Sequence, residues 1–89
     1  MNRVRVIVSG RVQGVSFRDA CRRKAIEHRV SGWVRNRADG GVEAVFEGAP
    51  GAVQAMVAWS RIGPPAATVE QIELHQEAPS GLDGFTIEI

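Results

Sequence analysis

The segment Gly-Arg-Val-Gln-Gly-Val-Ser-Phe-Arg, residues 10–18, decides how the rest of the chain is arranged. Before it, residues 3–9 alternate valine with other side chains, which predicts a strand. After it, residues 17–28 carry apolar side chains at every fourth position, which predicts a helix with one buried face. The segment is therefore expected to be a strand-to-helix turn that contains two glycines.

A turn of this kind favours the binding of a tetrahedral anion. It can direct several backbone N–H groups into one concavity, and the helix N-terminus adds partial positive charge there. Arg18 ends the segment, and its planar guanidinium matches two phosphate oxygens. The alternative is an ordinary turn followed by a solvated arginine. The expected phosphate-binding loop comprises Gln13, Gly14, Val15, Ser16, Phe17 and Arg18, with Ser16 capping the helix.

The remaining elements follow from the spacing of apolar residues and of turn residues. We expect strands at residues 32–38, 42–47, 68–76 and 85–89, and a second helix at residues 51–62. The order is βαββαβ plus a short C-terminal strand. It predicts an α+β, ferredoxin-like sandwich, in which two helices cover one face of an antiparallel sheet. A chain of 89 residues is expected to form one domain, residues 1–89.

The charges are unevenly distributed along the chain, although the formal net charge is only +1. Residues 1–37 contain ten basic side chains and two acids, a net charge of +8. Residues 38–89 contain one basic side chain and eight acids, a net charge of −7. The basic half includes the loop segment, which favours an anionic ligand unless the two halves interleave and their charges mix. Arg11, Arg35 and Arg37 are most simply solvated charges.

The cysteine content and the hydropathy of the chain indicate its cellular compartment. The one cysteine, Cys21, excludes an internal disulfide and lies on the apolar stripe of the first helix, where burial is expected. The N-terminus lacks a long apolar run, and no stretch approaches the ~20 apolar residues that span a bilayer. We therefore expect a cytoplasmic protein without a membrane partner. His28 and His75 lie in no metal-ligand cluster, so no metal is expected.

Three blocks of this sequence resemble the acylphosphatase family. The first is the segment at residues 10–18, which is similar to the family's signature loop. The second, residues 32–43, is Gly-Trp-Val-Arg-Asn-Arg-Ala-Asp-Gly-Gly-Val-Glu, and the third is residues 59–69. They occur in the family's order, and the resemblance covers nearly the whole chain. It implies a small hydrolase that splits an acyl phosphate into a carboxylate and inorganic phosphate.

The resemblance also implies roles for two residues. Arg18 would bind the phosphoryl group, and Asn36, in the second block, would position the attacking water. Without the resemblance, Asn36 would be a strand-end asparagine bonded to backbone. No cofactor is implied, the expected partner is a small acyl phosphate with inorganic phosphate as product and inhibitor, and the protein is expected to be a monomer. A covalent route is disfavoured, because the thiolate of cysteine-dependent phosphatases precedes the arginine by six residues, where this chain has Val12.

Two other functions remain open at this stage. Ferredoxin-like sheets include RNA-binding and other non-catalytic anion-binding modules, whose strands carry stacking aromatics. This chain has three Phe, two Trp and no Tyr, without that pattern, so no nucleic acid is expected. Similar domains also occur at the N-terminus of larger hydrogenase-maturation enzymes that transfer carbamoyl groups. The length of this chain argues against its being a detached domain of such an enzyme.

One residue departs from the family pattern. The family usually has glycine close to position 29, where the first helix is expected to end, and this chain has arginine. Helices often end with a left-handed residue, which glycine adopts without strain. A left-handed arginine would cost ~1 kcal/mol. The departure therefore concerns stability and not the chemistry.

Overall fold

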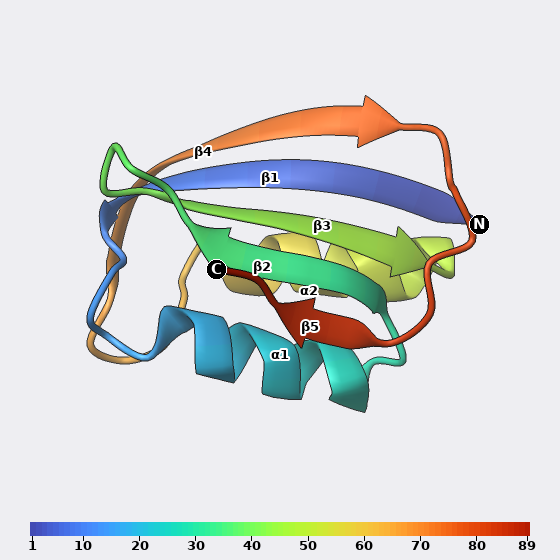
Figure 1. Ribbon diagram of the computed structural model, residues 1–89, viewed down its shortest axis with the longest axis horizontal. Coiled ribbons are helices and arrows are strands. Elements are labelled where there is room, and N and C mark those ends of the chain that lie inside the picture. Colours follow the sequence, from blue (N-terminus) through green and yellow to red (C-terminus); the bar gives the residue numbers. More distant parts are fainter.

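The computed structural model describes residues 1–89 and has the predicted order of elements (Figure 1). The elements are β1 (Asn2–Arg11), α1 (Phe17–Glu27), β2 (Ser31–Asn36), β3 (Val42–Gly48), α2 (Pro50–Ser60), β4 (Thr68–Glu77) and β5 (Phe85–Ile87). The βαββαβ order with a terminal strand is thus confirmed. No boundary differs from the expectation by more than two residues; β2, for example, ends at Asn36 and not at residue 38.

The five strands form one sheet in the order β4-β1-β3-β2-β5. The first four pair antiparallel, as predicted. The strand β5 pairs in parallel with β2, so the complete sheet is mixed. Helix α1 packs against β2 and β5, and α2 packs against β1 and β3, which leaves the opposite face of the sheet without helices.

The pairing of the central strands brings two distant parts of the chain to one end of the sheet. Both β1 and β2 are antiparallel to β3, so they run parallel to each other. Their C-terminal ends therefore lie at the same end. Figure 1 shows the loop after β1 and the turn after β2 at this end, and the loop continues into α1. The expected phosphate loop and Asn36 consequently become neighbours.

The apolar face of α1 is the one that the sequence predicts. Phe17, Cys21 and Ala25 are buried and belong to a core shared with the inward valines of β1. Burial raises the pKa of the Cys21 thiol, so the side chain stays neutral and packs as a small apolar group. Phe17 also packs against Trp59 of α2, with 5.1 Å between the ring centroids. This contact fixes the first residue of α1 against the second helix.

The expected side-chain cap at Ser16 is wrong. Ser16 does precede the helix, but its backbone is left-handed, with φ 65° and ψ 26°, and its hydroxyl makes no capping hydrogen bond. A side-chain cap normally requires an extended backbone at this position. Only the backbone of Ser16 takes part, because its carbonyl accepts a hydrogen bond from the Ala20 N–H at 3.1 Å. The left-handed turn leaves the first N–H groups of α1 without a side-chain acceptor.

At its other end, α1 terminates with a Schellman motif. The Arg29 N–H donates to the Ile26 carbonyl at 3.1 Å, and the Val30 N–H donates to the Ala25 carbonyl at 2.8 Å. This motif requires a left-handed residue between the helix and Val30, and Arg29 adopts it with φ 57°. Arg29 therefore adopts the conformation for which a cost of ~1 kcal/mol is expected. Its strain is retained because the motif satisfies two helix carbonyls.

The face of the sheet opposite the helices is covered by ion pairs. Two glutamates of β3 are buried there, Glu43 with 4% and Glu47 with 1% of their surface exposed. Seven contacts of 2.7–3.6 Å join Arg3, Arg5, Arg35 and Arg37 to Asp39, Glu43, Glu47 and Glu77. The expectation that Arg35 and Arg37 are simply solvated is wrong. The basic and acidic halves of the sequence interleave here, so their charges largely cancel on this face.

Glu47 fastens the segment between β4 and β5 to the sheet. Its carboxylate accepts hydrogen bonds from the backbone N–H groups of Ser80, Gly81 and Leu82 at 2.8–2.9 Å. Arg3 adds an ion pair at 3.4 Å. The hydrogen bond from the Ser80 N–H is the largest of the causes that lower the pKa of Glu47. The C-terminal strand is thus held in place by a buried anion.

We expect Arg29→Gly to stabilise the protein by ~1 kcal/mol, because glycine adopts the left-handed conformation without strain. Arg29→Ala is the matched control, since it also removes the charge but keeps a Cβ. Urea unfolding should give a higher midpoint for the glycine variant than for the alanine variant. Equal midpoints would show that the backbone at residue 29 is unstrained.

We expect Glu47→Gln to be less stable than the wild type at pH 7, with a difference that shrinks in acid. A folded-state pKa below the ordinary 4.5 adds stability above that value, and the added stability is lost as the pH falls through the lowered folded value. Urea unfolding between pH 7 and pH 3 measures the difference. The control is Glu70→Gln on exposed β4, which should change little. A difference that stayed constant with pH would contradict the role of the buried carboxylate.

Candidate active site

A hollow of about 230 Å³ lies where the β1–α1 loop meets the end of β2. Eight residues line this loop hollow: Val12, Gly14, Ser16, Phe17, Arg18, Asp19, Asn36 and Ile87. Four of the six expected loop residues are among them, together with Asn36. The fold thus brings together residues separated by about twenty positions in the sequence.

The backbone of the loop leaves its N–H groups unpaired. Gly14 and Ser16 are both left-handed, with φ 72° and φ 65°, on either side of Val15. None of the N–H groups of residues 14–19 donates to a backbone carbonyl. A run of free N–H groups before and within a first helical turn is a suitable environment for an anion. For most of its length the loop therefore offers hydrogen-bond donors from its backbone and not from charged side chains.

The other two loop residues support the hollow from outside. Val15 is buried in the core with 8% of its surface exposed. The Gln13 side-chain amide donates to the Arg37 carbonyl at 2.8 Å and to the Gly41 carbonyl at 2.9 Å. Both of its hydrogens are thus used on the β2–β3 turn. Gln13 joins the loop to the hairpin that carries Asn36, and its amide does not line the hollow.

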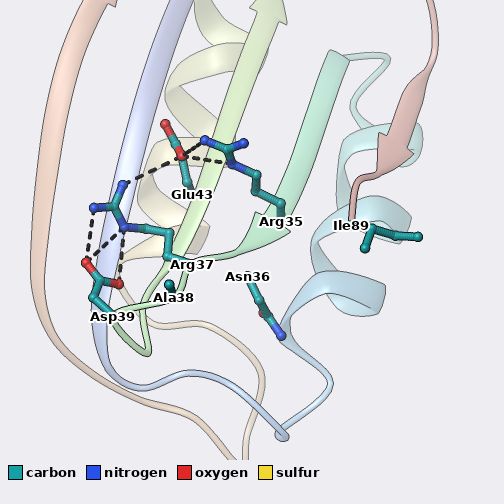
Figure 2. Close-up of a pocket in the computed structure, with 7 residues that line it drawn as sticks. All are labelled: Arg35, Asn36, Arg37, Ala38, Asp39, Glu43 and Ile89. Carbon is teal, nitrogen blue, oxygen red and sulfur yellow. Dashed lines mark hydrogen bonds and ion pairs between the residues drawn. The ribbon is translucent and has the colours of Figure 1, made fainter.

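Arg18 and Asn36 are polar side chains in the loop hollow without a partner in the chain, as is the Ser16 hydroxyl. Arg18 has no carboxylate within ion-pair distance, whereas Arg35 and Arg37 both contact Glu43. Asn36 pairs with Val42 through its backbone, while its amide makes no hydrogen bond within the chain. Figure 2 shows this amide directed toward the chain that leads into α1, away from the two arginines. Both side chains are therefore available to a ligand.

A second, larger hollow of about 370 Å³ lies beside the first and shares Asn36 with it. This arginine hollow is the one drawn in Figure 2, and Arg35, Arg37, Asp39 and Glu43 form most of its wall. Glu43 accepts hydrogen bonds from Arg35 at 2.7 and 3.0 Å. Burial acts to raise the pKa of Glu43, but the bonds from Arg35 and Arg5 outweigh it and lower the pKa. The arginine charges are therefore already neutralised here.

Three residues of the loop hollow, Val12, Asp19 and Ile87, are not among the site residues expected from the sequence. Asp19 lies in the first turn of α1 and is 3.5 Å from Arg23, a pairing that an i, i+4 spacing predicts. Ile87 comes from β5, which follows α1 by more than fifty residues and reaches the hollow by parallel pairing with β2. Nothing near Ile87 in the sequence indicates that pairing. The alternation of Phe85 and Ile87 predicts a strand but not its neighbour.

Metal ligands do not gather in the structure. No group of three or more His, Cys, Asp or Glu side chains is arranged to hold an ion. Neither helix combines the length and the apolar composition needed to cross a bilayer. The loop hollow itself offers backbone N–H groups, the Arg18 guanidinium, the Asn36 amide and the Ser16 hydroxyl, with the Asp19 carboxylate beside them.

Comparison with known proteins gives concordant results. The family model for acylphosphatase matches residues 4–87. The acylphosphatase of Chloroflexus aurantiacus is 56% identical over 86 residues, which cover 96% of this chain and 94% of that protein. The crystal structure of Bacillus subtilis acylphosphatase has a TM-score of 0.96 and 38% identity, and each chain is fully covered.

A longer protein contains a similar unit. The structure of T. kodakarensis HypF matches the whole of this chain with 38% identity and a TM-score of 0.83, over 12% of its own length. The single-domain relatives, in contrast, match from end to end. With the model match and the identity over nearly the full length, the chain belongs to the acylphosphatase family of enzymes.

Proposed function

We propose that this acylphosphatase binds the phosphoryl group of an acyl phosphate in the loop hollow, between the loop N–H groups and Arg18. We propose further that Asn36 positions the water that attacks the phosphorus. The observation that supports this most is the single hollow in which an unpaired guanidinium, an unpaired amide and a run of unpaired N–H groups meet. The acyl phosphate and its hydrolysis belong to the family; the roles of the residues are the proposal.

The reaction places modest demands on these groups. The bond between phosphorus and the bridging oxygen breaks, and the acyl group leaves as a carboxylate, which is stable without protonation. No general acid is required. The site has to hold the phosphoryl group, offset its negative charge and align the water opposite the leaving oxygen. Arg18 and the loop N–H groups meet the first two requirements, because charge-assisted hydrogen bonds to a phosphate are strong and directional.

Asn36 suits the third requirement because its amide is neutral and carries both a donor and an acceptor. The amide oxygen can accept a hydrogen bond from the water, while the phosphoryl oxygens can accept from its NH₂ group. Water then attacks phosphorus directly and becomes part of the inorganic phosphate, losing its protons to solvent or phosphate oxygens. The scheme uses neither a metal ion nor a covalent intermediate.

The side chains available for a covalent route are poorly placed. Cys21 is fully buried, and burial raises the pKa of its thiol, so it is neither accessible nor ionised. Ser16 lines the loop hollow, but no histidine lines it beside that hydroxyl to act as a base. Position 12, which corresponds to the thiolate of cysteine-dependent phosphatases, is a buried valine. These features support attack by water.

Three further expectations accompany this proposal. Inorganic phosphate, the product, should compete with the substrate for the loop hollow. The protein should act as a single domain, residues 1–89, and as a monomer, which is supported by two exposed glutamates of the edge strand β4, Glu70 and Glu73. A cytoplasmic location is supported by the buried, unpaired Cys21.

Variants of Arg18 and Asn36 should differ in how they change phosphate inhibition and turnover. We expect Arg18→Ala to weaken both phosphate inhibition and turnover, because it removes charge-assisted hydrogen bonds worth about 1.5–3 kcal/mol each. We expect Asn36→Ala to retain phosphate inhibition while turnover falls on the order of 10²-fold, because the water is misplaced. The measurements are kcat on acetyl phosphate and the inhibition constant of inorganic phosphate.

Three controls accompany these variants. Urea unfolding verifies that each remains folded. A phosphate monoester should be a poor substrate of the wild type, because an alkoxide leaves poorly without protonation. A chelator should leave the wild-type rate unchanged. A folded Asn36→Ala with normal turnover, or one that lost phosphate inhibition as severely as Arg18→Ala, would refute the positioning of water by Asn36.

Gln13 provides a test of how the loop is held. We expect Gln13→Ala to destabilise the protein by about 2 kcal/mol, since two hydrogen bonds to the hairpin are lost. Turnover should fall as well, by up to about 10²-fold, as the loop shifts relative to Asn36. The exposed Gln71→Ala serves as the matched control. Normal turnover in folded Gln13→Ala would show that the loop keeps its position without the amide.

A further inference from the structure

The loop hollow contains one acidic side chain to which the proposed function gives no role. Asp19 lies in the first turn of α1, directly after Arg18, and is the only acid that lines this hollow. A carboxylate in the first turn of a helix is favoured by the helix dipole, so a purely structural role is the simplest alternative. Its place beside the proposed phosphoryl site also lets the charge of Asp19 act on a bound anion.

The charge of Asp19 is only weakly neutralised. Its ion pair with Arg23, one turn farther along α1, measures 3.5 Å, and 69% of the Asp19 side chain and 71% of the Arg23 side chain are exposed. Pairs as exposed as this one are weak, because water screens them. The buried Glu43, in contrast, contacts three arginines at 2.7–3.6 Å. Asp19 therefore keeps most of its negative potential at the edge of the loop hollow.

We propose that Asp19 lowers the affinity of the loop hollow for inorganic phosphate and so favours the release of products, and that Arg23 limits this effect. The proposal rests on the function proposed for the loop hollow. An acyl phosphate dianion and water give a carboxylate, hydrogen phosphate and a proton, so the products in the site carry one more negative charge than the substrate. A fixed carboxylate beside the site repels the products more strongly than the substrate.

The charge of Asp19 is tested with Asp19→Asn, which removes the charge and keeps the size of the side chain. At about 0.1 M salt, we expect the inhibition constant of inorganic phosphate to fall about fivefold, and the KM of acetyl phosphate to fall by a smaller factor. At about 1 M salt the Debye length is about 3 Å, so the difference from the wild type should largely disappear. Asp19→Glu restores the charge and should restore the wild-type constant.

A second ion pair of α1 provides matched controls. Lys24 and Glu27 pair at 3.7 Å, and Glu27 lies about 12 Å beyond Asp19 along the helix. Charges act over about 10 Å at 0.1 M salt, so Glu27→Gln should leave the inhibition constant of phosphate nearly unchanged. Arg23→Ala should raise this constant by more than Lys24→Ala does. The excess should shrink when Asp19→Asn is also present, because Arg23 then has no carboxylate to neutralise.

The sign of the change separates the proposal from a structural role. If Asp19 only stabilised the start of α1, Asp19→Asn would loosen the loop and raise the inhibition constant of phosphate. A rise or no change in a variant that urea unfolding shows to be folded, or an equal fall in Glu27→Gln, would overturn the proposal. A wild type that phosphate does not inhibit, or full turnover in Arg18→Ala, would instead refute the function proposed for the loop hollow.

Discussion

The antiparallel pairing of β3 with both of its neighbours is the constraint on which the site depends. Because β1 and β2 flank β3 in the same direction, the segments that follow them leave the sheet at one end. One of these segments becomes the loop before α1, and the other begins at Asn36. The Gln13 amide then fixes their separation by bonding to two carbonyls of the β2–β3 turn. Strand pairing and this side-chain contact together set the position of the loop relative to the Asn36 amide.

Electrostatics divides the molecule into a neutralised face and a reactive end. Four arginines on the face opposite the helices are paired with carboxylates, two of which are buried in β3. Such pairs orient the side chains, and because the charges are matched they leave little positive electrostatic potential to attract a ligand. Arg18, from the same basic half of the sequence, is unpaired in the loop hollow. Arg18 thus adds positive charge to the loop hollow, where the free N–H groups add to it.

The sequence predicts the elements well because their signals are local. Two predicted faces are buried as expected. One follows from the valine alternation in β1, and the other from the spacing of Phe17, Cys21 and Ala25 in α1. Side-chain interactions across strands are not local, and for this reason the sequence predicts Arg35 and Arg37 to be solvated although both pair with Glu43. The cap at Ser16 failed because the loop imposes a left-handed backbone that propensity does not reveal. Asn36 was found by family resemblance, and Ile87 was missed because a parallel partner strand has no local signature.

The buried carboxylate of Glu47 holds the C-terminal segment against the central strand as one structural unit. The strand β5 has only three residues and lies at the edge of the sheet, so its ladder alone would hold it weakly. Three N–H groups of the preceding segment are anchored on a side chain of central β3. Opening of this unit would uncover Phe85 and remove Ile87 from the loop hollow while the other four strands stay paired. Slow amide exchange of residues 80–82 would therefore report on one wall of the hollow independently of global unfolding.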